Sequence, residues 1–149
     1  MKKNYFLIKI LIIYLLIFPN SFAAKSSYFD KGKKLFDKKE FNNSKIFFEK
    51  DIVFNPKSEK SYLYLAKIFH NDENDLEQEI NLKNVLLLNP KNDEAIYMLV
   101  LLKIRQSDYS KAKELIERFD LVCISFCEKK KEIREKFEKL TPENAKEHN

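Results

Sequence analysis

Glycine is nearly missing from this chain: of its 149 residues one is glycine, four are proline, two are histidine and two are cysteine. One glycine cannot make the glycine-rich loop that cradles a phosphate, and so few glycines and prolines leave little room for β-turns or long loops. His70 and His148 accompany no nucleophile in a catalytic pattern and no carboxylate cluster at metal-ligand spacing. The sequence therefore predicts a non-enzymatic protein that needs no cofactor and no metal ion.

The charges do not form a binding site of one sign. The acidic run between Asp72 and Glu79 lacks the alternation and the glycine of a calcium-binding loop. The net charge is +5, but three lysines lie among the first nine residues, so a chain without that segment carries about +2 (5 − 3). The remaining lysines are interspersed with acids, which is typical of a solvated helical surface, and we predict no nucleic-acid partner.

Residues 1 to 24 differ in kind from the rest of the chain. Lysines at positions 2 and 3 precede an apolar run from Tyr5 to Phe18, which one lysine interrupts, and small residues follow it. This order is that of a secretory signal peptide, with cleavage after Ala23, because Ser21 and Ala23 then occupy the two small-residue sites. We predict a signal peptide at residues 1–23 and an exported, periplasmic mature chain.

A retained membrane anchor is the alternative for this segment. The apolar run has 14 residues (18 − 5 + 1), whereas a membrane-spanning helix needs about 20, so cleavage is favoured. Retention would place the protein at the inner membrane. No cysteine lies directly after the run, which disfavours a bacterial lipoprotein.

The segment from Tyr28 to Pro56 has the pattern of one helical hairpin. Apolar and small residues recur in two stripes at helical spacing, and Asn55-Pro56 ends the second stripe, where proline forbids a further helical turn. Asn89-Pro90 repeats this ending 34 residues later (90 − 56), a period typical of hairpins that stack because none buries its apolar face alone. We predict helices near residues 26–38, 41–54, 59–71, 75–88, 93–106 and 109–121.

On these residues the chain resembles the tetratricopeptide repeat (TPR) family, with units at residues 25–58, 59–92 and about 93–124. The matching residues are Tyr28, Gly32, Phe41, Ser44, Phe48 and Pro56 in the first unit, Tyr62, Leu65, Ala66, Phe69, Leu82, Val85 and Pro90 in the second, and Ile96, Leu99, Tyr109, Ala112 and Ile116 in the third. The resemblance implies an all-α fold, a solenoid of helical hairpins that forms a TPR-like superhelix. Gly32 and Ala66, 34 residues apart, are small where helices cross closely.

The chain departs from the family pattern at several positions. Asp75 stands where the family has an aromatic residue, Gln78 stands where it has alanine, and the third unit lacks the closing proline. Asp51 falls at a normally small, buried position. We expect Asp51 either to reach solvent or a lysine, or to reveal that the register is shifted by one residue.

A different pattern follows the third unit. Ile133, Phe137 and Leu140 recur at spacings of four and three in a charged segment, as expected of a helix that caps a solenoid. We predict a TPR-like domain over residues 24–140, with a capping helix at about 125–140 and a polar tail at 141–149.

Cys123 and Cys127 lie between the third unit and the cap. Two cysteines four residues apart on neighbouring helical turns come within disulfide distance, and an exported chain meets an oxidising compartment. A structural bridge is the first interpretation, and two buried free thiols are the second. A redox site is the third, because the spacing is not that of thioredoxin-like motifs.

In the TPR family the first helix of each unit lines a concave groove. The positions that carry over are Phe29, Lys33, Phe36, Lys60, Leu63, Lys67, His70, Tyr97, Leu101, Ile104 and Arg105. Such a floor suits an extended or helical peptide with apolar anchors and some negative charge. The alternative is that Phe36 and Ile104 pack between repeats. Tyr64 and Met98 stand where the family's carboxylate clamp needs polar residues, so that clamp is not implied.

Together, the resemblance and the N-terminal segment predict a protein-protein interaction scaffold or adaptor in the periplasm or cell envelope. Its partner would be an unidentified protein or peptide segment held in the groove. The alternative is a membrane-tethered assembly factor that keeps residues 1–24 as an anchor. A redox-active protein acting through Cys123 and Cys127 is less favoured, because no partner residue for that chemistry is found.

Overall fold

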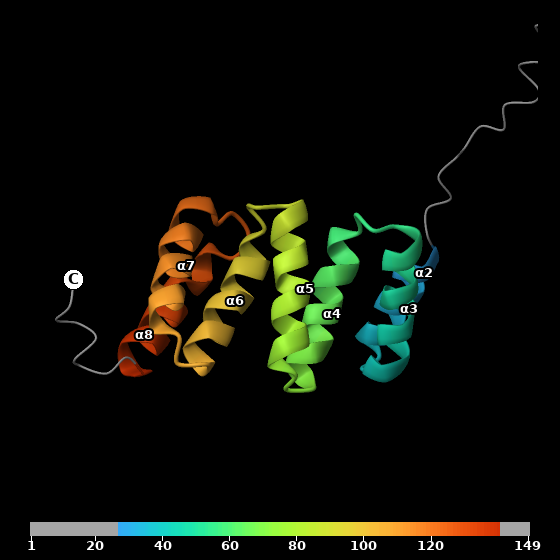
Figure 1. Ribbon diagram of the computed structural model, residues 1–149, viewed down its shortest axis with the longest axis horizontal. Coiled ribbons are helices and arrows are strands. Elements are labelled where there is room, and N and C mark those ends of the chain that lie inside the picture. Colours follow the sequence, from blue (N-terminus) through green and yellow to red (C-terminus); the bar gives the residue numbers. More distant parts are fainter. Residues whose placement is uncertain (1–26, 141–149) are drawn as a thin grey trace, which may run out of the picture.

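The computed structural model describes residues 27–140, which form a row of helices packed side by side (Figure 1). The helices are α2 (Ser27–Asp37), α3 (Phe41–Phe54), α4 (Glu59–Asn71), α5 (Asp75–Leu88), α6 (Asp93–Arg105), α7 (Tyr109–Val122) and α8 (Lys130–Leu140), with a 3-10 helix η1 at Cys127–Lys129. No strand occurs in residues 27–140. The predicted all-α solenoid of helical hairpins is confirmed. The signal peptide predicted at residues 1–23 and the tail at 141–149 lie outside the described residues.

The six predicted repeat helices agree with the structure to within one residue at each end. Three of them begin at side-chain caps: Asn74 accepts from the backbone N–H of Glu77 (3.2 Å), Asn92 from that of Ala95 (2.8 Å) and Asp108 from that of Lys111 (3.1 Å). The turns inside the hairpins also repeat. Lys39, Glu73 and Ser107, each 34 residues apart, have positive φ angles of 64°, 54° and 58°.

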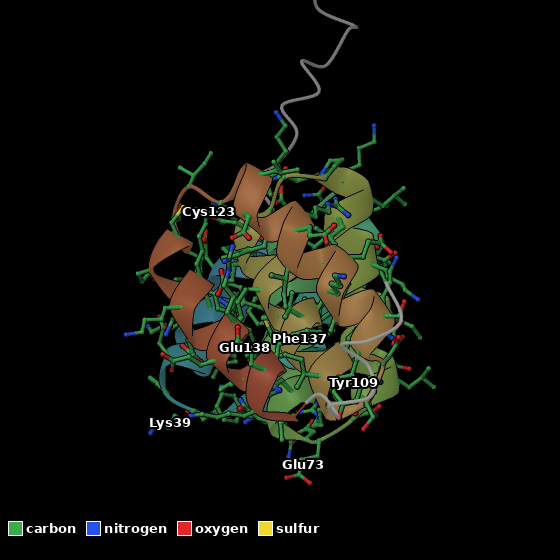
Figure 2. All side chains as sticks on the ribbon, turned by 90° about the vertical axis from the view of Figure 1, so that its left-hand side faces the viewer. Lys39, Glu73, Tyr109, Cys123, Phe137 and Glu138 are labelled. Atoms are coloured by element: carbon green, nitrogen blue, oxygen red, sulfur yellow. A yellow bond between two sulfur atoms is a disulfide. The ribbon has the colours of Figure 1, made fainter. Side chains whose placement is uncertain are left out.

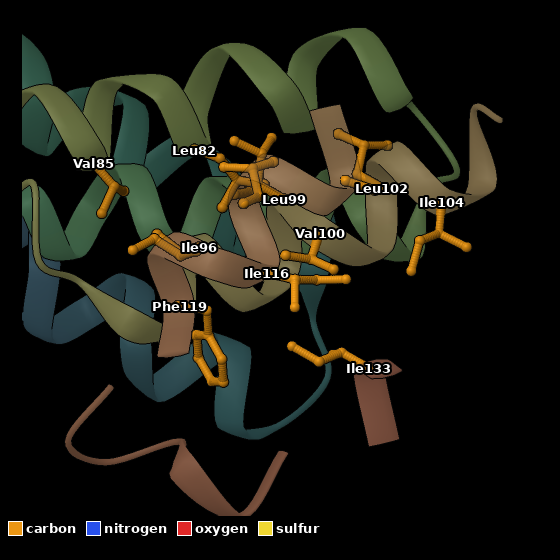
Figure 3. Close-up of a cluster of buried hydrophobic side chains, with 14 of the residues drawn as sticks. Leu82, Val85, Ile96, Leu99, Val100, Leu102, Ile104, Ile116, Phe119 and Ile133 are labelled. Atoms are coloured by element: carbon orange, nitrogen blue, oxygen red, sulfur yellow. The ribbon is translucent and has the colours of Figure 1, made fainter. Parts of the chain in front are cut away.

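Two clusters of buried side chains form the core. The larger cluster joins α4, α5, α6, α7 and α8. Figure 3 shows side chains from α5, α6 and α7 in this cluster, with Ile133 of α8 on the side of Ile116 and Phe119. The smaller cluster contains Phe48, Leu65, Ile68 and Phe69, with partly buried aromatic rings from α2 and α3 packed against it. Each hairpin thus buries its apolar faces against the next hairpin, as stacked repeats require.

Gly32 lies at the crossing of α2 and α3. A Cβ atom there would lie 2.8 Å from Phe48 Cε1, and the Gly32 carbonyl accepts from Ser44 Oγ at 2.8 Å. Ala66 is fully buried in the next unit. Small residues at these two positions therefore allow the close approach of neighbouring helices.

One expectation for Asp51, that its side chain reaches solvent, is wrong. Asp51 is 1% exposed, and its Oδ2 accepts hydrogen bonds from Ser58 Oγ and Ser61 Oγ, both at 2.5 Å. Since α3 and α4 otherwise have their predicted bounds, no register shift is needed. The serine hydroxyls at the start of α4 therefore supply hydrogen bonds to one oxygen of the buried Asp51 side chain, as a buried polar group requires.

The cap begins later than predicted, because α8 starts at Lys130 rather than near residue 125. The preceding residues form a connection in which Cys123 and Cys127 are joined by a disulfide with a Cα–Cα distance of 5.3 Å. Ile133 is fully buried, and the ring of Phe137 meets Tyr109 of α7 edge to face (Figure 2). The apolar stripe of α8 thus covers the end of the third hairpin.

Candidate binding surface

The first helices of the hairpins, α2, α4 and α6, carry all the residues predicted to line a groove, and we name their shared surface the A-helix face. At its N-terminal end the structure has an open hollow of about 400 Å³, whose lining residues are Phe29, Asp30, Asp51, Asn55, Lys57, Ser58, Glu59 and Lys60. Two of the predicted groove residues, Phe29 and Lys60, therefore meet in one concave place. Lys60 is exposed and Phe29 is half-buried.

An aromatic patch adjoins this hollow. The ring of Tyr64 lies edge to face with Phe29 (5.7 Å between centroids) and with Phe36 (4.9 Å), and it stacks on Phe48 (5.0 Å). Phe29, Phe36 and Tyr64 are all half-buried, so they combine packing between repeats with a face open to solvent. The packing alternative for Phe36 thus holds in part. Sequence reasoning missed Tyr64 as part of this surface, although its place on the second turn of the first helix of unit two could have indicated it.

Lys67 lies beside the aromatic patch and has a partner in the next unit. Its Nζ is 2.7 Å from Glu94 Oε1 and 4.9 Å from the centroid of the Tyr64 ring. Lys33 pairs with Asp37 within its own helix at 2.6 Å, and this hydrogen bond raises the pKa of Lys33 above its ordinary value. These two lysines of the predicted groove are therefore each paired with an acid of this chain.

Arg105 explains the departures from the family pattern in the second unit. Its guanidinium forms an ion pair with Asp75 and donates to Gln78 Oε1 at 2.9 Å. Its Nη1 also lies 3.5 Å from His70 Nδ1. Gln78 is 1% exposed, so a buried amide and a carboxylate in unit two are both satisfied by an arginine of unit three.

Three of the predicted groove residues are less accessible to a binding partner than expected. Leu63 and Ile104 are buried in the larger core cluster, so the prediction that they line an open groove is wrong, and the packing alternative for Ile104 is correct. They were misassigned because the inner face and the inter-repeat face of a helix lie side by side. Leu101 is half-buried and packs against that cluster.

Tyr97 is held by the cap. Its hydroxyl donates to Glu132 Oε1 at 2.9 Å, and its ring lies 5.9 Å from that of Phe126. Burial, followed by the hydrogen bond to Glu132, raises the pKa of Tyr97 to about 12. Hydrogen bonds from Lys136, Lys129 and Tyr97 lower the pKa of Glu132 to about 2. The C-terminal end of the A-helix face is therefore closed by η1 and α8.

Within residues 27–140 no group of three or more histidine, cysteine or acidic side chains is placed to hold a metal ion. Nor is any helix of this part long and apolar enough to cross a bilayer. The A-helix face combines a hollow, aromatic rings and ion pairs. This combination suits the binding of another molecule.

Several solved structures resemble this chain. The first TPR of Spaghetti (RPAP3), bound to the HSP90 peptide SRMEEVD, is 17% identical, with a TM-score of 0.68 over 76% of this chain and 90% of that one. The Sgt2 TPR domain from Aspergillus fumigatus is 15% identical, with a TM-score of 0.64 over 76% of this chain and 78% of that one. The C-terminal TPR-containing domain of a putative FK506-binding protein from Plasmodium falciparum is 17% identical, with a TM-score of 0.63 over 76% and 83%.

These likenesses show the fold: the described chain is a TPR-type solenoid of three hairpins and a cap. The predicted resemblance to TPR proteins is confirmed at this level. No protein-family model and no curated protein matches the sequence.

Proposed function

We propose that this protein is a protein-protein interaction scaffold or adaptor that binds a partner segment on its A-helix face. The observation that carries the proposal is the half-buried aromatic patch of Phe29, Phe36 and Tyr64 beside a hollow of about 400 Å³. Aromatic rings with one open face bury much area at little entropic cost, which makes them effective contact residues. The similar structure that holds an HSP90 peptide supports a peptide-like partner.

The charges around the hollow define the partner further. An apolar side chain of the partner would enter against Phe29, and an acidic residue would meet Lys60 at the rim. Lys67 and Arg105 already pair with Glu94 and Asp75, so an acidic partner residue there must compete with an acid of this chain. We therefore expect apolar anchors to supply most of the affinity and acidic residues to supply orientation.

For the location we propose export to the periplasm or cell envelope, on the sequence of residues 1–24. The second candidate is a membrane-tethered assembly factor in which the same segment is retained. A chain recovered from a periplasmic fraction with a mass that begins at Ala24 would support export with cleavage, and a full-length chain in the membrane fraction would support the tether.

Two substitutions test the proposed binding surface. Lys60→Glu reverses a charge at the rim of the hollow, and Leu101→Glu places a charge farther along the A-helix face. Each variant should recover less of the partner in a pull-down from an envelope extract than the unsubstituted chain does. Leu76→Glu is the matched control, since Leu76 is 69% exposed on α5 and lies outside the A-helix face. Equal recovery by all variants, with helicity unchanged by circular dichroism, would contradict the proposal.

A further inference from the structure

A row of apolar side chains stands in solvent at one edge of the solenoid. Val53, Leu87 and Leu121 are 34 residues apart, and each is the penultimate residue of its helix. They are 73%, 80% and 86% exposed, and Phe54 and Ile124 beside them are 69% and 84% exposed. Single exposed apolar residues are ordinary, but a residue repeated at the same place in every hairpin forms a continuous feature that a partner surface could cover.

These side chains belong to what we call the upper edge, after its place in Figure 1, where α3, α5 and α7 end. The upper edge comprises residues 53–60, 87–94 and 121–126. The opposite, lower edge contains the turns inside the hairpins, which are Lys38-Lys39-Glu40, Asp72-Glu73-Asn74 and Gln106-Ser107-Asp108. Figure 2 shows Lys39 and Glu73 at the end of the molecule away from Cys123. One edge is therefore apolar and the other wholly polar in its turns.

The solvent-exposed charges of the upper edge are positive. Its three acids are engaged within the molecule: Glu59 accepts from Asn89 Nδ2 and Asn92 Nδ2 (3.0 and 2.6 Å), Asp93 accepts from three backbone N–H groups, and Glu94 pairs with Lys67. Lys57 and Lys91, also 34 residues apart, are exposed in the turns between hairpins. Exposed lysines beside exposed apolar residues are the combination that binds anionic lipid interfaces.

The described part of the chain begins at this same edge. Tyr28, in the first turn of α2, stacks on Phe54 at 5.4 Å, so α2 begins beside the end of α3. Eight residues separate Phe18, the end of the apolar run, from Ser27, and a chain of that length reaches at most about 30 Å. If the run lies in a bilayer, the upper edge is the part of the repeats held nearest to it.

We propose that the upper edge is a membrane contact surface, in which the apolar row enters the interface of a phospholipid bilayer while Lys57 and Lys91 meet anionic headgroups. This inference takes the tethered alternative for residues 1–24. The upper edge contains five of the residues that line the hollow, which are Asn55, Lys57, Ser58, Glu59 and Lys60, but none of the aromatic patch. With the upper edge on the bilayer, the hollow lies at the membrane surface, and the rest of the A-helix face stays open to a partner. The side chains of the apolar row would enter the bilayer to a depth of about 5–10 Å at most, as those of interfacial segments do.

The absence of tryptophan from the chain gives a direct test. Leu87→Trp and Leu121→Trp each introduce a single fluorophore into the apolar row, and Leu76→Trp introduces one into an exposed site at the other end of α5. The full chain is reconstituted into vesicles of phosphatidylcholine and phosphatidylglycerol, with or without bromine on the lipid acyl chains. We expect brominated lipid to quench Leu87→Trp and Leu121→Trp and their emission to shift to shorter wavelength, while Leu76→Trp keeps its emission.

The controls separate the proposal from its rivals. Quenching of Leu76→Trp as strong as that of Leu87→Trp, or quenching of neither, would overturn the contact; the second result is also expected if a protein partner covers this edge. Omitting phosphatidylglycerol, or adding Lys57→Glu and Lys91→Glu to Leu87→Trp, should weaken the quenching. If quenching is unchanged by both, the role of anionic headgroups is wrong. Partner recovery by Leu101→Glu, a variant outside the upper edge, tests the A-helix face independently of these results, so the two proposals fail separately.

Discussion

At the scale of single residues, Gly32 is a position with little space for a side chain. The Cβ of an alanine would lie 2.8, 2.9 and 3.1 Å from three ring atoms of Phe48, and that ring is fully buried. Alanine gains about 1 kcal/mol over glycine in helix propensity, but overpacking costs about 1–3 kcal/mol. We expect Gly32→Ala to lower the free energy of unfolding by up to about 2 kcal/mol in urea denaturation.

The smaller side chain of Phe48→Leu serves as the control for this effect. In that background the alanine no longer meets a ring, so Gly32→Ala should become neutral or stabilising. An alanine variant that is equally destabilised in both backgrounds would show that the close approach to Phe48 is not the cause.

Glu59 and Asp93, each the first residue of its unit, have the same structural role. Glu59 accepts from the side chains of Asn89 and Asn92, and Asp93 accepts from the backbone N–H groups of Ile124, Ser125 and Phe126. Each acid therefore holds the turn that ends its own unit, about 30 residues later in the chain. The two residues use different donors, which sequence spacing alone does not reveal.

Asp93→Asn tests this role through the pH dependence of stability. Burial opposes ionisation of Asp93, but the backbone N–H groups of Ile124, Phe126 and Ser125 outweigh it and lower its pKa below the ordinary value. A lowered folded-state pKa adds stability above the unfolded pKa of about 4, and this stability is lost as the pH falls through the folded value. We expect Asp93→Asn to cost about 1 kcal/mol at neutral pH, since the site is partly exposed.

The measurement is urea denaturation of both proteins at pH 7 and at pH 3. The difference between them should shrink at pH 3, where the native carboxylate is increasingly protonated. A difference of the same size at both values would mean that the charge of Asp93 does not contribute.

At the scale of elements, the turns inside the hairpins use side-chain-bearing residues where glycine is favoured. Glu73 has a φ of 54°, a left-handed conformation that costs a residue with a Cβ about 1–2 kcal/mol. Glu73→Gly removes this cost but adds flexibility to the unfolded chain. We expect a net gain of about 0.5–1 kcal/mol in the free energy of unfolding. Gln106→Gly, at a position with a φ of −77°, should destabilise instead, and a gain from both variants would contradict this account.

The disulfide between Cys123 and Cys127 closes a loop of only five residues. Chain-entropy arguments give about 2 kcal/mol for so short a loop. We expect a reductant to lower the Tm of the native chain modestly and to leave unchanged the Tm of a variant that carries both Cys123→Ser and Cys127→Ser. Thermal unfolding followed by circular dichroism checks this. A collapse of the whole fold on reduction would show that the bridge does more than restrain the connection between α7 and α8.

At the scale of the whole molecule, the cap should stabilise its nearest neighbours most, because stacked repeats are coupled only to adjacent units. Ile133 is fully buried, whereas Leu140 on the same helix is 56% exposed. Ile133→Ala should cost about 2–4 kcal/mol, and Leu140→Ala should cost much less. Hydrogen exchange should show the greatest loss of protection in α6 and α7 and the smallest in α2 and α3. A uniform loss over all helices would indicate a single cooperative unit instead.

The A-helix face shows where the structure places the residues predicted for the groove. Phe29 and Lys60 were predicted for a groove and do line the hollow. Leu63 and Ile104 were predicted for it and are core residues, because the packing of the next hairpin decides which positions of a helix it covers. Tyr64 was excluded from one kind of site and proves central to the aromatic patch.

The sequence by itself determined the repeat, its 34-residue period and the helix bounds, because apolar spacing, caps and prolines act locally and act again in every unit. Only the tertiary structure decided which polar residues meet. Asp75 and Gln78 look like defects of the second unit until Arg105 of the third unit lies against them, and Asp51 looks misplaced until Ser58 and Ser61 surround it. Such partners lie up to 30 residues apart, and whether their side chains reach one another depends on how the stacked hairpins pack, which no local pattern contains.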